Sequence, residues 1–167
     1  MLYNIFKRLD KKINFPSASA HCDIPCKIYD PIVAQISVLT MIRMVDLIDE
    51  LERSEGEKGV KYISTLTRFI SQKEEHGAKL KEEIRIIWGD YIKPPQLDAF
   101  PELHDLVHGI MLKTSHCKQN VDKAATLQLL DQVNRFAEIF WESKGIKTTK
   151  SVCPYPPEKE VVYPVIK

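Results

Sequence analysis

The chain has 167 residues, of which 44% are hydrophobic and 28% charged, and its formal net charge is +1 at pH 7. These values are typical of one soluble globular domain with its own core. No apolar run approaches the roughly 18 residues that a membrane span needs, and the small net charge gives no general case for binding nucleic acid or a membrane. Four cysteines are too few for a disulfide scaffold, so we expect a reducing compartment.

The first segment, residues 1–20, has features of a leader that is removed on maturation. It carries a net charge of +3, so its removal would leave −2 on the remaining chain. Ala18 and Ala20 stand at the −3 and −1 positions of an A-x-A-like cleavage site before His21. Charged side chains interrupt residues 1–15, however, and the apolar stretch of a secretory signal is missing. A leader and an ordinary amphipathic N-terminal arm both stay open, and the missing apolar stretch favours the cytoplasm over export.

One imidazole and two thiols follow this segment, at His21, Cys22 and Cys26. In an uncut chain the two thiols can simply lie near each other, or form a reversible disulfide. In a chain that begins at His21, the α-amine, the backbone nitrogen of Cys22 and the two thiolates could surround one ion in a plane, with the His21 ring above it. Planar nitrogen and thiolate ligation suits Ni(II) or Cu(II) better than zinc. The leader would then prevent metal assembly until it is removed.

The next segments predict two long helices. Asp30-Pro31 is a strong helix start, and the helix that follows, from Ile32 to Leu51, has an apolar stripe wider than one core face needs, which predicts subunit contacts. A turn is expected over residues 54–59. From Val60 to about Tyr91 apolar residues recur at intervals of three and four, with Lys73 and Gly77 at the two positions where the pattern lacks one. Pro94-Pro95 ends this helix.

Two further helices are predicted, one from near Pro101 and one from about Val121 to Trp141. No segment shows convincing strand alternation. Four helices with short connections predict an all-α fold, an antiparallel four-helix bundle. The prolines beyond Lys144 suit an extended C-terminal tail over residues 146–167, which would wrap a neighbour or stay mobile.

Three blocks of sequence resemble one known family. Residues 21–31, HCDIPCKIYDP, resemble the nickel-binding hook of the nickel-containing superoxide dismutases, and we call this segment the hook. The segment 88–95, WGDYIKPP, followed by PELH at 101–104, and the segment IFWE at 139–142 resemble the same family in the same order. The resemblance runs from His21 to about Gly145. It implies a leader over residues 1–20, a catalytic domain over residues 21–145, and a helical bundle that assembles as a homohexamer.

The resemblance also implies a reaction and the residues that perform it. Nickel would be held by the amine and ring of His21, the amide nitrogen and thiolate of Cys22, and the thiolate of Cys26. Superoxide would be converted to dioxygen and hydrogen peroxide by Ni(III)/Ni(II) cycling. Tyr29 and Tyr91 would form a gate for small anions, Asp23 would hold the shape of the hook, and Lys93 would attract superoxide. A leader-processing protease would be a further partner, and neither nucleic acid nor a membrane is expected.

Three departures from the family pattern concern the surroundings of the hook. Position 27 is Lys, where a small Gly is common in the family. Some members fix the axial histidine with a glutamate on the first helix and an arginine on the second, whereas the corresponding residues here are Ser37 and His76. These differences leave open how the His21 ring is held.

Two rival functions and three minor features complete the sequence analysis. A nickel or copper carrier would use the same hook without turnover, and a thiol-redox protein would use a Cys22–Cys26 disulfide without metal. His104 and His108, at i and i+4, fit either a second metal site or ordinary packing. The internal His116-Cys117 pair lacks a second thiol nearby and is interpreted as structural, and Cys153 as a free thiol.

Overall fold

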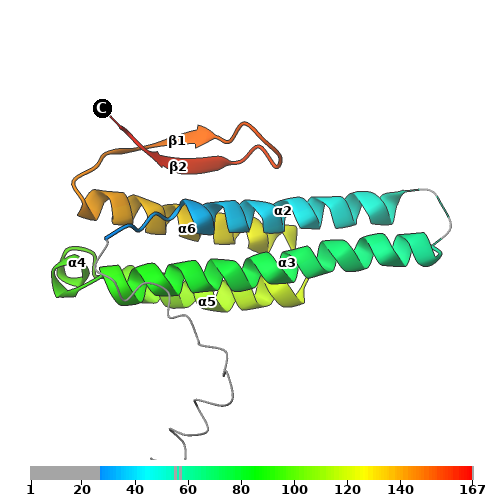
Figure 1. Ribbon diagram of the computed structural model, residues 1–167, viewed down its shortest axis with the longest axis horizontal. Coiled ribbons are helices and arrows are strands. Elements are labelled where there is room, and N and C mark those ends of the chain that lie inside the picture. Colours follow the sequence, from blue (N-terminus) through cyan, green and yellow to red (C-terminus); the bar gives the residue numbers. More distant parts are fainter. Residues whose placement is uncertain (1–26, 55, 57, 167) are drawn as a thin grey trace, which may run out of the picture.

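The computed structural model describes residues 27–54, 56 and 58–166, and this part of the chain is mostly helical (Figure 1). Its helices are α2 (Ile32–Arg53), α3 (Val60–Ile86), the short π-helix η1 (Ile87–Tyr91), α4 (Pro94–Ala99), α5 (Leu103–Gln119) and α6 (Lys123–Ser143). Two strands follow, β1 (Thr148–Val152) and β2 (Glu160–Pro164). None of the helices in the described part combines the length and apolar character that crossing a membrane requires.

Four long helices lie side by side and share one apolar core. Helix α2 packs against α3 and α6, and α5 packs against the same two helices (Figure 1). All four contribute fully buried side chains, including Met41, Leu80, Ile110 and Phe136. The Asp30-Pro31 start signal is confirmed, since the Asp30 carboxylate accepts a hydrogen bond from the Ile32 backbone N–H at 2.8 Å. The predicted helices are therefore present, with the short α4 as an unforeseen addition.

The two gaps in the apolar pattern of α3 have a structural reason. Lys73 is buried, and its ammonium donates to the backbone carbonyls of Cys117, Lys118 and Asn120 at the end of α5. The last carbonyls of a helix lack partners within the helix, so a buried cation satisfies them. At Gly77, a Cβ atom would lie 2.5 Å from Cγ of Lys118, so only glycine lets α3 approach α5 this closely. Both residues therefore lie where α3 contacts α5.

The segment predicted as an extended C-terminal tail, residues 146–167, contains two paired strands, so the prediction of a purely α-helical fold is wrong. Strands β1 and β2 pair antiparallel, from Thr148 opposite Pro164 to Val152 opposite Glu160, and form a hairpin, residues 148–164, beside α6 (Figure 1). Three of its prolines lie in the loop between the strands, at Pro154, Pro156 and Pro157, where a missing N–H breaks no strand pairing. The β-branched Val161 and Val162 lie in β2, and both are buried.

Side-chain amides from two helices fix the hairpin. The Gln35 amide donates to the Val162 carbonyl at 2.9 Å, and the Asn134 amide donates to the Glu160 carbonyl at 2.9 Å. The Asn134 side-chain oxygen accepts from the Val162 N–H at 3.3 Å. These bonds give partners to backbone N–H and carbonyl groups of β2 that face away from β1. The hairpin thus belongs to the folded body of the chain.

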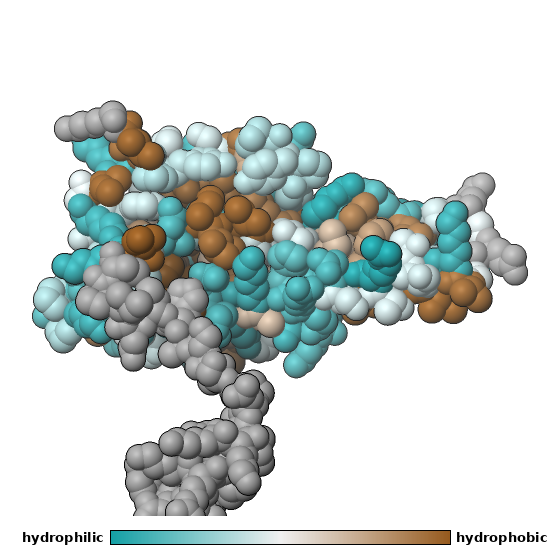
Figure 2. Space-filling model, in the orientation of Figure 1, coloured by the Kyte–Doolittle hydropathy of each residue, from teal (hydrophilic) through white to brown (hydrophobic). Residues whose placement is uncertain are grey.

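The α2–α3 pair extends beyond the other helices as a two-helix arm (Figure 1). The buried residues of α3 begin only at Lys73. N-terminal to it, Val60, Ile63 and Ile70 are 85%, 58% and 39% exposed, and apolar side chains gather at this end of the molecule (Figure 2). The arm therefore presents an apolar surface that the described part of the chain does not cover.

Candidate metal centre

The predicted metal ligands His21, Cys22 and Cys26, together with Asp23, lie outside the described residues. In the described part, no group of three or more His, Cys, Asp and Glu side chains could hold a metal ion. A competing ligand cluster is therefore absent from these residues. The donor set of the hook, one imidazole with two thiolates, is chemically suited to nickel.

Tyr29 and Tyr91 come together although 62 positions separate them in the sequence. Their ring centroids lie 5.8 Å apart with an angle of 47° between the planes, and both side chains are half-buried. We call them the tyrosine pair. Because Tyr29 follows Cys26 by three residues, the pair adjoins the end of the segment that carries the predicted ligands.

A wide helical turn sets the position of Tyr91. At the end of α3 the Ile92 N–H bonds the Ile87 carbonyl five residues earlier, at 3.2 Å, which is π-helical pairing. Such single turns insert one extra residue into a helix and are frequent at functional sites. Pro94 follows three residues after Tyr91 and prevents the helix from continuing. Tyr91 is consequently the last residue of this turn.

Helix α6 holds Tyr91 from the other side. The Tyr91 ring lies 5.0 Å from the Phe140 ring, centroid to centroid, and its hydroxyl forms a 2.8 Å hydrogen bond with the Ser143 hydroxyl. The Lys144 ammonium lies 4.6 Å from the centroid of the Tyr91 ring. Ser143 and Lys144 had no place in the sequence-based site, because only the fold brings the end of α6 to η1.

Lys93 lies on the surface two residues after Tyr91. Its side chain is directed to the Gly89 carbonyl, at 3.4 Å, and its backbone N–H donates to the Gln96 side chain at the start of α4. Among the described carboxylates, none forms an ion pair with Lys93. Its charge is therefore available to an anion in solution near the tyrosine pair.

Lys27 adopts a backbone conformation that favours glycine. Its φ angle is +56°, in the left-handed region, where a Cβ atom costs about 1 kcal/mol or more. This gives a physical reason for the small residue that the family commonly has at this position. The lysine here adds a positive charge within the hook, and its backbone is locally strained.

Ser37 and His76, at the positions where an axial-histidine clamp was considered, bond within their own helices. The Ser37 hydroxyl donates to the Val33 carbonyl at 2.7 Å and is buried. The His76 ring nitrogen Nδ1 lies 2.8 Å from the Gln72 carbonyl. His21 itself lies outside the described residues.

His104 and His116 have side-chain partners, and the two described cysteines are buried. His104 accepts a hydrogen bond from the Trp88 indole at 3.1 Å, and His116 pairs with Asp122 at 3.0 Å. The backbone N–H of Ala125, with help from His116, lowers the pKa of Asp122, the N-cap of α6. Burial raises the pKa of the Cys117 thiol. Cys117 and Cys153 are buried free thiols, as predicted for Cys153.

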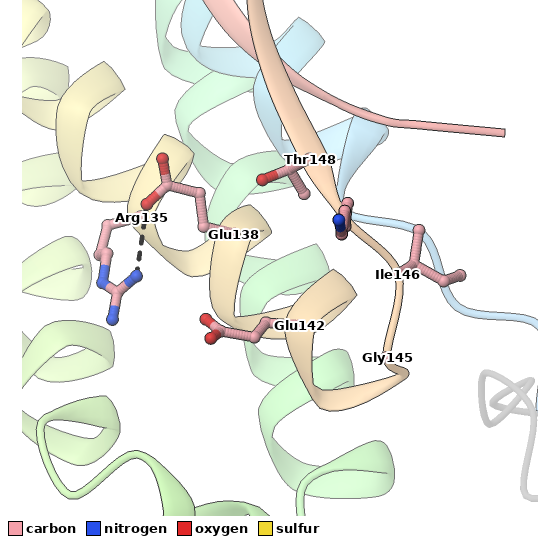
Figure 3. Close-up of a pocket in the computed structure, with 7 residues that line it drawn as sticks. Arg135, Glu138, Glu142, Gly145, Ile146 and Thr148 are labelled. Atoms are coloured by element: carbon pink, nitrogen blue, oxygen red, sulfur yellow. Dashed lines mark hydrogen bonds and ion pairs between the residues drawn. The ribbon is translucent and has the colours of Figure 1, made fainter.

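A separate pocket lies between α6 and the start of β1 (Figure 3). It has a volume of about 490 Å³, and the ion pair of Arg135 with Glu138 spans one side of it. Glu142 and Gly145 also line it, whereas neither tyrosine of the pair does. This pocket is distinct from the tyrosine pair.

The fold and the tyrosine pair define a class, a helical protein in which two tyrosines meet just after a His-Cys segment of the sequence. The sequence model of the nickel-containing superoxide dismutases matches residues 16–144. The superoxide dismutase [Ni] of Streptomyces coelicolor (strain ATCC BAA-471 / A3(2) / M145) is 33% identical over 128 residues, which cover 77% of this chain and 91% of that protein. The chain belongs to the nickel-containing superoxide dismutase family, whose members are oxidoreductases with a nickel cofactor.

Solved structures are similar in fold. A native nickel superoxide dismutase at 1.30 Å is 31% identical with a TM-score of 0.64, over 74% of this chain and 99% of that one. A nickel-containing superoxide dismutase with ligation corresponding to the oxidised state is 30% identical with a TM-score of 0.65, over 75% and 99%. These proteins are matched almost entirely, while about a quarter of this chain has no counterpart in them.

Proposed function

We propose that this protein dismutes superoxide at a nickel ion held by the hook after residues 1–20 are removed. The amine and ring of His21, the amide nitrogen and thiolate of Cys22, and the thiolate of Cys26 would bind the metal. Bound nickel supplies one-electron chemistry between Ni(III) and Ni(II), so that one superoxide is oxidised to dioxygen and a second, with two protons, is reduced to hydrogen peroxide. The tyrosine pair beside the hook is the observation that carries this proposal.

The tyrosine pair acts as a gate to the metal. The two half-buried rings, with centroids 5.8 Å apart, are in aromatic contact, so they would restrict access to the metal to small species such as superoxide and water. The Ser143 hydroxyl keeps the Tyr91 phenol in a fixed orientation, which suits a group that orders water near the reacting oxygen. Asp23 would hold the shape of the hook, and the His21 ring would bind in the oxidised state and leave on reduction.

Positive charge near the gate draws superoxide toward it. Removal of residues 1–20 would leave −2 on the rest of the chain, and such a net charge does not attract an anion by itself. Lys93, exposed and without an ion-pair partner among the described residues, provides attraction close to Tyr91. The attraction is therefore local.

The family resemblance extends the proposal to assembly and processing. The four long helices would be the antiparallel four-helix bundle of a homohexamer, and the uncovered apolar side chains of the two-helix arm support burial in an assembly. A protease would remove the leader, and the enzyme would work in the cytoplasm. The short leader without an apolar stretch supports this location.

Substitutions in the hook test the proposal. Chains that begin at His21 are loaded with nickel, and bound nickel and superoxide decay are measured for the wild type, Cys22→Ser and Cys26→Ser. We expect both variants to lose nickel and all metal-dependent decay. Cys117→Ser, which alters the internal His-Cys pair instead, serves as the matched control and keeps both. Nickel bound by the wild type without any decay would instead identify a metal carrier.

A further inference from the structure

Lys144 occupies a defined place directly after α6. The helix ends in paired hydrogen bonds, from the Gly145 N–H to the Glu142 carbonyl at 2.8 Å and from the Ile146 N–H to the Trp141 carbonyl at 3.0 Å. This pattern needs a left-handed residue after the helix, and Gly145 supplies it with a φ of +71°. The termination is sharp, so the backbone at Lys144 is fixed rather than frayed.

The side chain of Lys144 lies over two aromatic rings of the site. Its ammonium is 4.6 Å from the centroid of the Tyr91 ring and 4.9 Å from that of Phe140. Both distances are within the range of a cation–π contact. The ammonium forms no ion pair with any described carboxylate. A positive charge thus stays beside the tyrosine pair without being neutralised there.

Lys144 differs from Lys93 in how firmly its charge is placed. Lys93 contacts only a carbonyl of its own turn, at 3.4 Å, whereas two ring faces hold the Lys144 ammonium. A charge held in one position by rings is preorganised and loses little conformational entropy when an anion approaches. The neighbouring Ser143 hydroxyl, bonded to the Tyr91 phenol, supplies a polar group beside the charge.

We propose that Lys144, in addition to Lys93, attracts small monoanions to the tyrosine pair, and that it orients the Tyr91 ring for them. The ligand class is a compact anion of charge −1, which in this family is superoxide. This inference rests on the proposed function for its substrate, but the anion site itself can be measured without turnover.

The first test compares reaction rates at different ionic strengths. In nickel-loaded chains beginning at His21, Lys144→Gln is expected to lower the second-order rate constant for superoxide about threefold at low salt. The difference in rate constant between the wild type and Lys144→Gln should disappear as the salt concentration rises from about 0.01 M to about 1 M. Over this range the Debye length falls from roughly 30 Å to roughly 3 Å. Lys144→Arg keeps the charge and should restore the rate. A loss that is independent of salt, or no rescue by arginine, would overturn the proposal.

Lys61→Gln is the matched control for this experiment. Lys61 is exposed and lies at the far end of the same helix that leads to Tyr91, roughly 45 Å away at about 1.5 Å per residue. The variant makes the same change in net charge, so it should leave the rate nearly unchanged. Equal losses in Lys61→Gln and Lys144→Gln would assign the effect to net charge and overturn the role of Lys144.

The second test uses azide, a stable monoanion, with the nickel-free chain. Azide is titrated while the backbone amide NMR signals of Tyr91 and Ser143 are followed. We expect saturable shifts in the wild type, Lys144→Arg and Lys61→Gln, and at least threefold weaker binding in Lys144→Gln. Absence of shifts in the wild type would contradict the anion site. Azide binding in a protein that does not consume superoxide would instead refute the proposed function and keep the anion site.

Discussion

The helical body, residues 32–143, and the C-terminal hairpin, residues 148–164, differ in how they join one apolar core. The body is joined by a continuous apolar core to which all four long helices contribute. The hairpin adds Cys153 and Val161 to this core, and the buried amides of Gln35 and Asn134 fix the position of β2 by hydrogen bonds. Burial of apolar area tolerates variation in side chains, whereas a buried amide must meet its partners in one geometry.

The same boundary separates what this chain shares with its relatives from what it adds. The family match ends at residue 144, one residue before the glycine that terminates α6. The hairpin therefore begins just after the last residue that the family model matches, and it packs against α6. The hairpin is thus an addition to the shared helical fold, packed onto its core and fixed there by hydrogen bonds from side-chain amides. The predictions below test this, and the first two compare the full chain with a chain that ends at Gly145.

Asn134→Ala should give the largest effect on stability. The substitution leaves the Val162 N–H, the Glu160 carbonyl and one bond of the Gln35 amide without partners. Each buried unsatisfied group costs about 1–3 kcal/mol, so we expect a loss of about 3 kcal/mol in the full chain. Urea denaturation measures it. In the chain that ends at Gly145 the loss should shrink to about 1 kcal/mol, and an equal loss in both would mean that Asn134 serves the helices instead.

Lys73→Met should cost about 2 kcal/mol, because three carbonyls at the end of α5 lose a cationic donor. This contact lies wholly within the helical body. Thermal and urea unfolding should therefore give the same loss with and without the hairpin. Lys79→Met, at an exposed position of the same helix, is the control and should change stability by less than about 0.5 kcal/mol. A loss that depended on the hairpin would contradict a contact confined to the helical body.

Gly77→Ala should destabilise the chain by about 1 kcal/mol. The added Cβ would overlap Cγ of Lys118 at 2.5 Å, and this strain exceeds the roughly 1 kcal/mol that alanine gains over glycine within a helix. Gly109→Ala provides the comparison, since its Cβ would meet only the end of the flexible Gln132 side chain at 3.0 Å. Calorimetry should show a lower melting temperature for Gly77→Ala. For Gly109→Ala the melting temperature should be unchanged or slightly higher.

Lys150→Ala should have the smallest effect, below about 0.5 kcal/mol. The ion pair of Lys150 with Glu138, at 3.0 Å, joins β1 to α6 on the surface, where solvent and salt screen it. Chemical denaturation at two salt concentrations tests this. A loss comparable to that of Asn134→Ala would show that surface charge, rather than the buried amides, fixes the hairpin.

The sequence predicts the helical body well because helices leave a repeating signal. The intervals of three and four along residues 60–91 locate α3 and η1, and Asp30-Pro31 marks the start of α2. The repeat also shows that Lys73 and Gly77 are exceptions. It cannot show what they contact, because α5 is distant in the sequence and only packing brings its last turn to them.

The hairpin and half of the site are not predictable in this way. The prolines of residues 154–157 suggest an extended tail. Only the pairing of the two strands shows that these prolines lie in the loop between them. The tyrosines are identified by family resemblance, whereas Ser143 and Lys144 reach Tyr91 through the docking of α6 against η1. A lysine after a helix has no sequence signal that separates it from other surface lysines.

The central claim is that a hook freed at His21 makes a nickel enzyme, and one measurement tests it most directly. Two chains, one beginning at Met1 and one at His21, are supplied with nickel under reducing conditions, and superoxide decay is followed by pulse radiolysis. Fast, nickel-dependent decay by the His21 chain alone is the predicted result, because only that chain has a free amine beside Cys22. Equal decay by both chains would contradict the need for the free amine, and nickel binding without decay in either would contradict the enzyme.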